Sequence, residues 1–159
     1  MNLTPETVAD QARWVHDRDS VVVPLVNDVR SDLGAAFETT VDPITDEQYH
    51  DTVATVFADG DRAVNVAALV GILRNLDAAN DYPGFVVDEL LARELAAMIA
   101  GEQPLRLLAE ATFHYADVTH HGEADEPAGL DDLDAALAAG VQTRVPGWDW
   151  RAEESPFGA

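Results

Sequence analysis

Apolar residues recur every three or four positions along most of this chain, and this spacing constrains its fold more than any other feature. Between Val22 and Phe37 the apolar side chains follow one another at such steps. This spacing gathers them on one face of an α-helix but scatters them over both faces of a strand. The sequence offers no pair of strand-like runs joined by hairpin turn residues, so the pattern predicts an all-α fold.

Capping and breaking residues divide the pattern into a bundle of six or seven amphipathic helices. Thr4 ahead of Pro5 is typical of a helix start, and the helix that follows is expected to turn Val8, Ala12 and Val15 inward. Later helices are predicted to begin at a cap at Ser20 and at a capping box of Thr45 and Gln48, and the second of these has Val53, Val56 and Phe57 on its buried side. Further helices are predicted over residues 61–79, 85–100, 104–122 and 131–139, and Gly140 is expected to end the last of them.

The chain of 159 residues is the size of one domain. We expect residues 1–140 to form a helical bundle domain and residues 141–159 to form a C-terminal tail that contains two tryptophans. The residues from Val66 to Leu73 are uncharged and almost all apolar. A helix that is apolar on all sides usually has neighbours on all sides, so the helix over 61–79 is predicted to be the central one.

The cellular location that we expect rests on the length of the apolar runs and on the first ten residues. The run from Val66 to Leu73 is the longest one without a charge, and it is far shorter than the roughly 20 residues that a membrane helix needs. The first ten residues have neither the basic start nor the apolar stretch of a secretory signal. We therefore expect a cytoplasmic protein that is not inserted in a membrane.

The charge of the chain is strongly one-sided. Thirty Asp and Glu residues oppose nine basic residues, all of them arginine, which gives a net charge of -21. Carboxylates at this density repel one another in dilute buffer, and molar salt screens that repulsion because its Debye length is only about 3 Å at 1 M. The composition resembles that of proteins from salt-in halophiles such as haloarchaea. We expect no binding to nucleic acid, because no basic cluster is present and phosphate contacts weaken steeply as salt rises.

The segment from Glu110 to His121 holds three of the five histidines. Glu110, His114, Asp117 and His121 are separated by four, three and four residues, which places them on one stripe of a helix. Such a stripe can simply face water, with pairs such as Glu110 and His114 supporting the helix. Alternatively, imidazoles and carboxylates one turn apart can share a divalent metal ion.

A second fragment bears on that alternative. Glu47 and His50 form a Glu-x-x-His pair, the spacing that ferritin-like di-iron bundles use twice. Only one copy is present, because Glu110 and His114 are one residue further apart. An acid in the first helical turn also has a local electrostatic role. We therefore expect His50 to lie at the rim of the core, and Glu47 and His50 remain candidate additional metal ligands.

The C-terminal tail contains Trp148 and Trp150, flanked by Arg144 and Arg151. One hypothesis is that an indole folds back and seals the bundle. The other is that the tail anchors a protein partner or a sister subunit, since Trp and Arg dominate interface hot spots.

The residue types also restrict the chemistry. The chain has neither cysteine nor lysine, which excludes thiolate and Schiff-base catalysis, and it lacks the nucleophile elbow, the phosphate loop and the His-Glu-x-x-His motif. The leading hypothesis is a non-catalytic interaction or regulatory module that binds a protein partner, most simply a second copy of itself. The alternative is a metal-binding helical protein, a sensor or a metal-dependent enzyme, that uses the stripe on the helix over 104–122.

Overall fold

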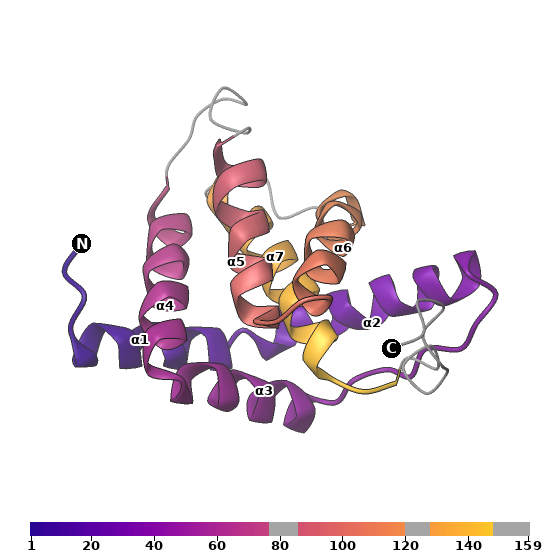
Figure 1. The fold of residues 1–159 in the computed structure, drawn as a ribbon, viewed down its shortest axis with the longest axis horizontal. Helices are drawn as coiled ribbons and strands as arrows, with labels where there is room; N and C mark the ends of the chain where they lie inside the picture. The colour runs from indigo at the N-terminus through magenta and orange to yellow at the C-terminus, as the bar shows by residue number, and fades with distance from the viewer. Residues whose placement is uncertain (77–85, 120–127, 148–159) are drawn as a thin grey trace.

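The computed structural model describes residues 1–76, 86–119 and 128–147, and these residues form seven α-helices and one π-helical segment (Figure 1). The elements are α1 (Pro5–His16), α2 (Asp19–Ala36), α3 (Asp46–Ala58), α4 (Gly60–Asn75), η1 (Val86–Ala92), α5 (Arg93–Ala100), α6 (Leu105–Thr119) and α7 (Ala128–Arg144). The predicted all-α bundle is confirmed. Among the described helices, none combines the length and the apolar character that a membrane span requires.

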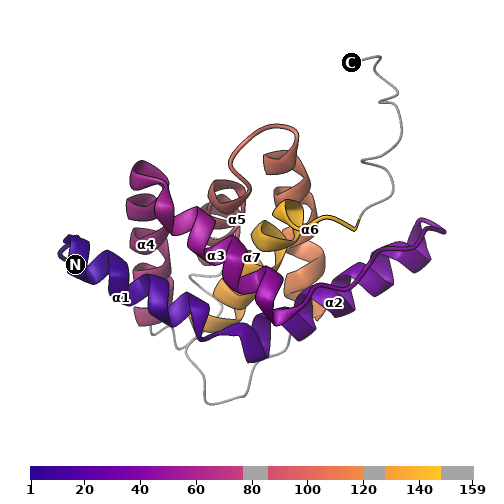
Figure 2. The same ribbon diagram turned by 90° about the horizontal axis from the view of Figure 1, so that it is seen from below.

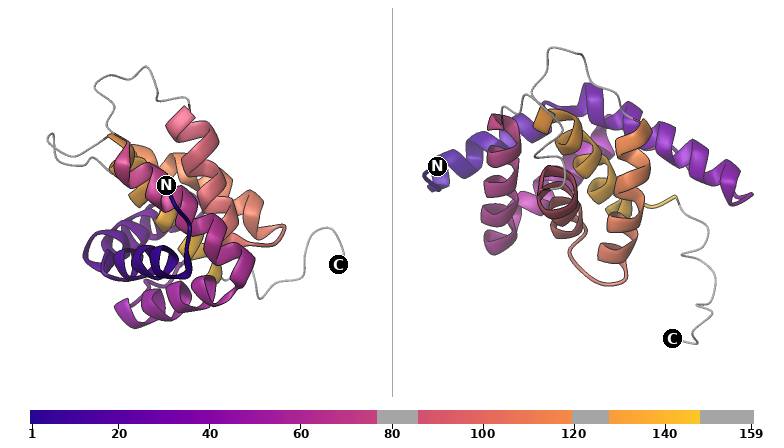
Figure 3. Two further views of the ribbon diagram at one scale, coloured as in Figure 1. Left: turned by 90° about the vertical axis from the view of Figure 1, so that its left-hand side faces the viewer. Right: turned by 90° about the horizontal axis from the view of Figure 1, so that it is seen from above.

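The helices form two groups around α7. α1 and α2 follow one another along one edge of the molecule, and α3 crosses in front of them (Figure 2). α4, α5 and α6 stand side by side in a row above that edge (Figure 1). α7 lies between the two groups (Figure 3) and packs against α2, α4, α5 and α6.

α7 is therefore the central helix, and the prediction that the helix over 61–79 is central is wrong. All residues from Leu133 to Thr143 are buried, whereas α4 leaves Val64, Asn65 and Ile72 exposed. The middle of α7 consists mainly of alanine and glycine, which let neighbouring helices approach closely. Small residues do not stand out in an apolar pattern, although they permit the tightest packing.

Gly140 shows the same effect at one position. A Cβ atom added there would lie 2.7 Å from the Cβ atom of Ile99 and 3.0 Å from the carbonyl oxygen of Ala96. Glycine is thus needed for the contact between α7 and α5. The helix continues through it to Arg144, so the predicted helix end at Gly140 is wrong.

The helix starts were predicted with mixed success. Capping boxes begin both α1 at Thr4 and α3 at Thr45, where the Thr45 hydroxyl accepts from the Gln48 amide. α2 begins at Asp19, and the residue before it, Arg18, makes no side-chain cap bond. The expected cap at Ser20 is therefore wrong, because the chain turns directly from α1 into α2.

Candidate interaction groove

An apolar groove runs between α1 on one side and α3 and α4 on the other. It has two parts, with volumes of about 530 and 450 Å³, which share Ala12 and Phe57. The first part is lined by Leu3, Thr4, Pro5, Val8, Ala9, Ala12, Phe57, Gly60, Ala63 and Val64. Only Thr4 among these has a polar side chain, so this part offers an almost entirely apolar surface.

Small residues create the groove. α1 contributes Ala9 and Ala12, and the facing helices contribute Ala54, Gly60 and Ala63. α1 packs against both α3 and α4, but these short side chains leave space between the helices. The groove explains why Val8, Ala12 and Phe57, which were predicted to face the core, are only half-buried, while Val15 at the end of α1 is fully buried.

The second part of the groove ends among polar side chains. Arg13, His16 and Asp17 line it together with Val53, Ala54 and Phe57. Arg13 pairs with Asp10 one turn earlier, and His16 Nδ1 lies 2.9 Å from Asp17 Oδ1. The groove is therefore amphipathic along its length, apolar near Gly60 and polar near His16.

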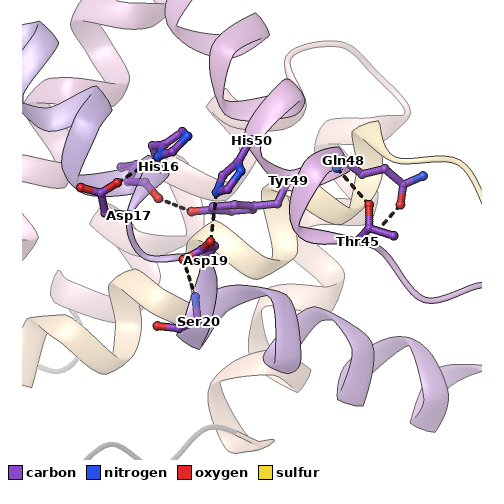
Figure 4. A network of polar contacts seen from close by, with 9 residues as sticks. His16, Asp17, Asp19, Ser20, Thr45, Gln48, Tyr49 and His50 are labelled. Atoms are coloured by element: carbon purple, nitrogen blue, oxygen red, sulfur yellow. Dashed lines mark hydrogen bonds and ion pairs between the residues drawn. The ribbon is translucent and has the colours of Figure 1, made fainter.

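At this polar end the imidazole of His16 stacks on that of His50 from α3 (Figure 4). The ring centroids are 3.9 Å apart and the planes differ by 13°. His50 Nε2 lies 3.0 Å from Asp19 Oδ2, whereas His16 is bound to Asp17. The ring nitrogens thus point at different carboxylates, and the stack joins α1 to α3 rather than forming a shared ligand site.

Buried polar contacts hold the junction of α1 and α2 beneath this stack. The fully buried Tyr49 hydroxyl donates to the carbonyl oxygen of Val15 at 2.5 Å. Arg18 donates two hydrogen bonds of 2.8 Å each to the carboxylate of Asp134 on α7. Burial, and then the charges of Asp134 and Asp19, raise the pKa of the Tyr49 phenol well above its ordinary range. The polar end of the groove therefore lies against buried, hydrogen-bonded residues of the core.

The stripe on α6 that was considered as a metal site faces η1 and α5. Arg106 pairs with Glu94 at 3.1 Å, and His114 Nε2 lies 3.1 Å from Glu89 Oε1. Glu89 also pairs with Arg93 at 2.8 Å. His114 therefore pairs across to η1, and the predicted pair of Glu110 with His114 is wrong.

The remaining candidate ligands do not gather in the described residues. Glu110 and Asp117 are half-buried on α6, Glu47 is exposed in the first turn of α3, and His121 lies outside the described residues. Within residues 1–76, 86–119 and 128–147, no three His, Asp or Glu side chains are placed to hold a metal ion. The metal hypothesis, which relied on His121, stays a prediction.

Of the candidate interaction residues in the tail, only Arg144 can be placed, because Trp148, Trp150 and Arg151 lie outside the described residues. Arg144 Nε donates to the carbonyl oxygen of Ile99 near the end of α5. Burial, and then the nearby charge of Arg62, lower the pKa of Arg144. Arg144 thus makes contacts inside the bundle.

The apolar pattern alone did not predict the groove, because it treats every apolar residue on a stripe as core. A usable signal was present in the size of those residues. Ala9 and Ala12 on α1 are too short to fill the space that Val15 fills one turn later. On α1, which has few neighbouring helices, these small residues leave an open surface, whereas those of α7 are closed over by its neighbours.

Comparison with known proteins adds a family and no function. A family model described as Domain of unknown function (DUF7984) matches residues 1–159. No curated protein and no solved structure matches the chain.

Proposed function

We propose that this chain, which belongs to the DUF7984 family of domains of unknown function, is a non-catalytic interaction module of a salt-in cytoplasm. In this proposal the groove between α1, α3 and α4 holds an amphipathic helix of a protein partner. The groove is the observation that carries the proposal. Helix-in-groove docking, in which an amphipathic helix lays its apolar face into an apolar groove, is a recurring mode of recognition.

The shape of the groove supports a helical occupant. α1 forms one whole wall, and its 12 residues give it a length of about 18 Å. A partner helix of three to four turns has a matching length. Phe57 stands between the two parts of the groove, so the partner would place one large apolar side chain on each side of it.

The charges on the surrounding helices favour a basic partner. The exposed acids on α1, α3 and α4 and at their ends are Glu6, Asp10, Asp17, Asp46, Glu47, Asp51, Asp59 and Asp61. Only Arg13 and Arg62 oppose them on these helices near the groove. Ion pairs in direct contact lie within the Debye length of about 3 Å at 1 M salt, so they persist where long-range forces are screened. Arg or Lys residues beside the apolar face of the partner helix would therefore add to binding.

The ionisable groups at the polar end form a charged rim beside the apolar part of the groove. Arg13, His16 and His50 are each paired with a carboxylate of a neighbouring helix turn or element. These pairs order the rim of the groove.

A designed peptide tests the proposal. The probe is a labelled amphipathic helix with leucines on one face and arginines beside them, and its binding to the full chain is followed by fluorescence anisotropy in molar KCl. Ala12→Phe fills the space that both parts of the groove share, and we expect it to weaken binding at least about tenfold. The matched control is Ala36→Phe, at an exposed position on the far end of α2.

Two outcomes would overturn the proposal: equal binding to both variants, or no saturable binding to the unmodified chain. A second peptide with glutamates in place of the arginines tests the charge argument. We expect it to bind more weakly than the first peptide.

A further inference from the structure

One arginine at the contact of α1 and α4 has an unusual set of partners. Arg74, in the last turn of α4, is half-buried, and its guanidinium lies over the ring of Trp14 on α1, 4.4 Å from the ring centroid. Within the described residues it makes one hydrogen bond, of 2.9 Å, from Nη1 to the neutral amide oxygen of Gln11. A guanidinium has five N–H donors, so most donors of Arg74 have no acceptor in that part of the chain.

The other described arginines all reach stronger acceptors. Two of them, Arg30 and Arg144, donate to backbone carbonyl oxygens. Five of them pair with a carboxylate oxygen at 3.3 Å or less, namely Arg13, Arg18, Arg62, Arg93 and Arg106. Arg74 is therefore an exception in a chain with 30 acidic residues.

The charge beside Arg74 is also positive. The guanidinium of Arg18 lies 5.3 Å from the centroid of the same Trp14 ring, and two hydrogen bonds join it to the carboxylate of Asp134. Burial, and then the charge of Arg18, lower the pKa of Arg74, so both effects disfavour its charged form. Arg74 and Arg18 with Asp134 sum to one positive charge, on a chain whose net charge is -21.

The free donors of Arg74 are accessible. Gln11 takes Nη1, which leaves Nε and Nη2 on the other edge of the guanidinium. Neither of these atoms is buried without a partner, so a small molecule can reach both. The contact with Trp14 holds the plane of the guanidinium in place.

We propose that this edge of Arg74 binds the carboxylate of a small organic acid, beside Trp14 and Arg18. Two N–H groups on one edge of a guanidinium match the two oxygens of a carboxylate. A single negative charge balances the single positive charge of the cluster. Chloride carries the same charge but lacks the second acceptor atom, so the geometry favours the carboxylate even in molar KCl.

This site is separate from the groove, because Gln11, Trp14, Arg18 and Arg74 do not line it. One bidentate contact at a half-buried position gives weak binding, and we expect a dissociation constant on the order of millimolar or weaker. Acetate is the simplest probe, since it offers the carboxylate and little else.

Thermal unfolding of the full chain tests the site. Potassium acetate replaces part of the KCl in molar salt at constant ionic strength, and we expect a saturating rise of a few degrees in the melting temperature of the parent chain. Arg74→Gln should lose most of this rise. Arg13→Gln removes the same charge from an exposed arginine of α1, so it is the matched control and should keep the rise.

Equal rises in Arg74→Gln and the parent chain would show a general effect of acetate on the solvent and would overturn the site. So would the lack of any rise in the parent chain, which is the result expected if an acid outside the described residues already pairs with Arg74. Potassium phosphate should raise the melting temperature less than acetate does. A larger rise with phosphate would overturn the assignment to a carboxylate.

A second variant supplies the carboxylate from the chain itself. Gln11→Glu replaces the neutral oxygen that lies 2.9 Å from Arg74 Nη1 and keeps every other residue of the cluster. We expect a higher melting temperature than that of the parent chain in KCl, although the variant adds a negative charge, and a several-fold smaller response to acetate. An unchanged response to acetate would overturn the role of Arg74, even if Arg74→Gln failed to fold.

The two proposals are tested independently. Arg74 lies outside the groove, so Arg74→Gln should bind the basic peptide like the parent chain while it loses the response to acetate. Failure of the acetate site therefore does not decide whether the groove binds a helix.

Discussion

α7 and α1 both carry apolar stripes, but they use them in opposite ways. Every residue of α7 from Leu133 to Thr143 is buried, while Val15 is the one buried residue of α1. α7 packs against helices on several sides, whereas α1 lies at the edge of the molecule against α3 and α4 (Figure 2). The number of neighbouring helices therefore contributes to burial, in addition to the apolar content of each helix. The same difference separates the closed core around α7 from the open groove beside α1, to which we assign the proposed binding role.

The largest expected effect is the loss of the buried ion pair at α7. The Asp134 side chain is fully buried and that of Arg18 is 20% exposed, so Asp134→Ala leaves a poorly hydrated guanidinium without its carboxylate. We expect the free energy of unfolding in molar KCl to fall by about 3 kcal/mol. Asp17→Ala, at the rim of the groove with a side chain that is 77% exposed, is the matched control and should unfold like the parent chain. Equal losses of unfolding free energy in Asp134→Ala and Asp17→Ala would contradict the difference between the buried α7 and the exposed rim of the groove.

Enlarging one small residue in each region gives the next largest difference. Gly140→Ala forces a Cβ atom to within 3.0 Å of the Ala96 carbonyl oxygen, which cannot move freely, and overpacking of this kind costs about 1–3 kcal/mol. Ala12→Leu extends into the open groove instead. We expect it to change the free energy of unfolding by no more than about 0.5 kcal/mol. Denaturant melts of both variants measure the difference. A large loss of unfolding free energy in Ala12→Leu would mean that the groove is closed.

Tyr49 on α3 donates to Val15 of α1 and lies within the electrostatic influence of Asp134 on α7, and it predicts a pH dependence of stability. Its pKa is raised in the folded protein, so the folded chain holds the phenol proton more tightly than the unfolded chain, in which the phenol titrates near pH 10. The stability contributed by the neutral phenol is present below about pH 10 and is lost as the pH rises further.

Tyr49→Phe should therefore lose about 1 kcal/mol at neutral pH through the missing hydrogen bond. Above about pH 10 its stability should fall less steeply than that of the parent chain, which pH-dependent urea melts can measure. Tyr115→Phe, at a half-buried tyrosine on α6 whose pKa is raised by burial and by Asp32, should change the slope less. If the stability of Tyr49→Phe and that of the parent chain fell equally steeply above pH 10, the raised pKa of the Tyr49 phenol would be contradicted.

The smallest expected effect concerns metal ions. Because His114 is paired with Glu89, we expect zinc, manganese or iron to leave the melting temperature of both the parent chain and His114→Ala unchanged. The metal hypothesis instead expects that a bound metal ion raises the melting temperature of the parent chain by mass action. It expects no such rise in His114→Ala. Calorimetry of metal-free protein in molar KCl separates the two.

Much of the fold could be predicted from local patterns. The capping boxes at Thr4 and Thr45 bond residues three positions apart, so their partners are visible in the sequence. The candidate site was harder to predict. The contact of His16 with His50 and that of His114 with Glu89 each join residues of different helices, and helical periodicity cannot identify such partners. The small residues of α1 were visible, but their meaning depended on which helix would face them.

The sequence by itself determined that this acidic chain folds into amphipathic helices and where most of them begin, because caps and periodicity act within one or two turns. Only the tertiary structure decided that α7 is central, that the α6 stripe is paired with η1, and that the face of α1 is left open as a groove. These properties depend on which helices lie next to one another. That arrangement arises from contacts between residues far apart in the chain, where the size of a side chain matters as much as its polarity.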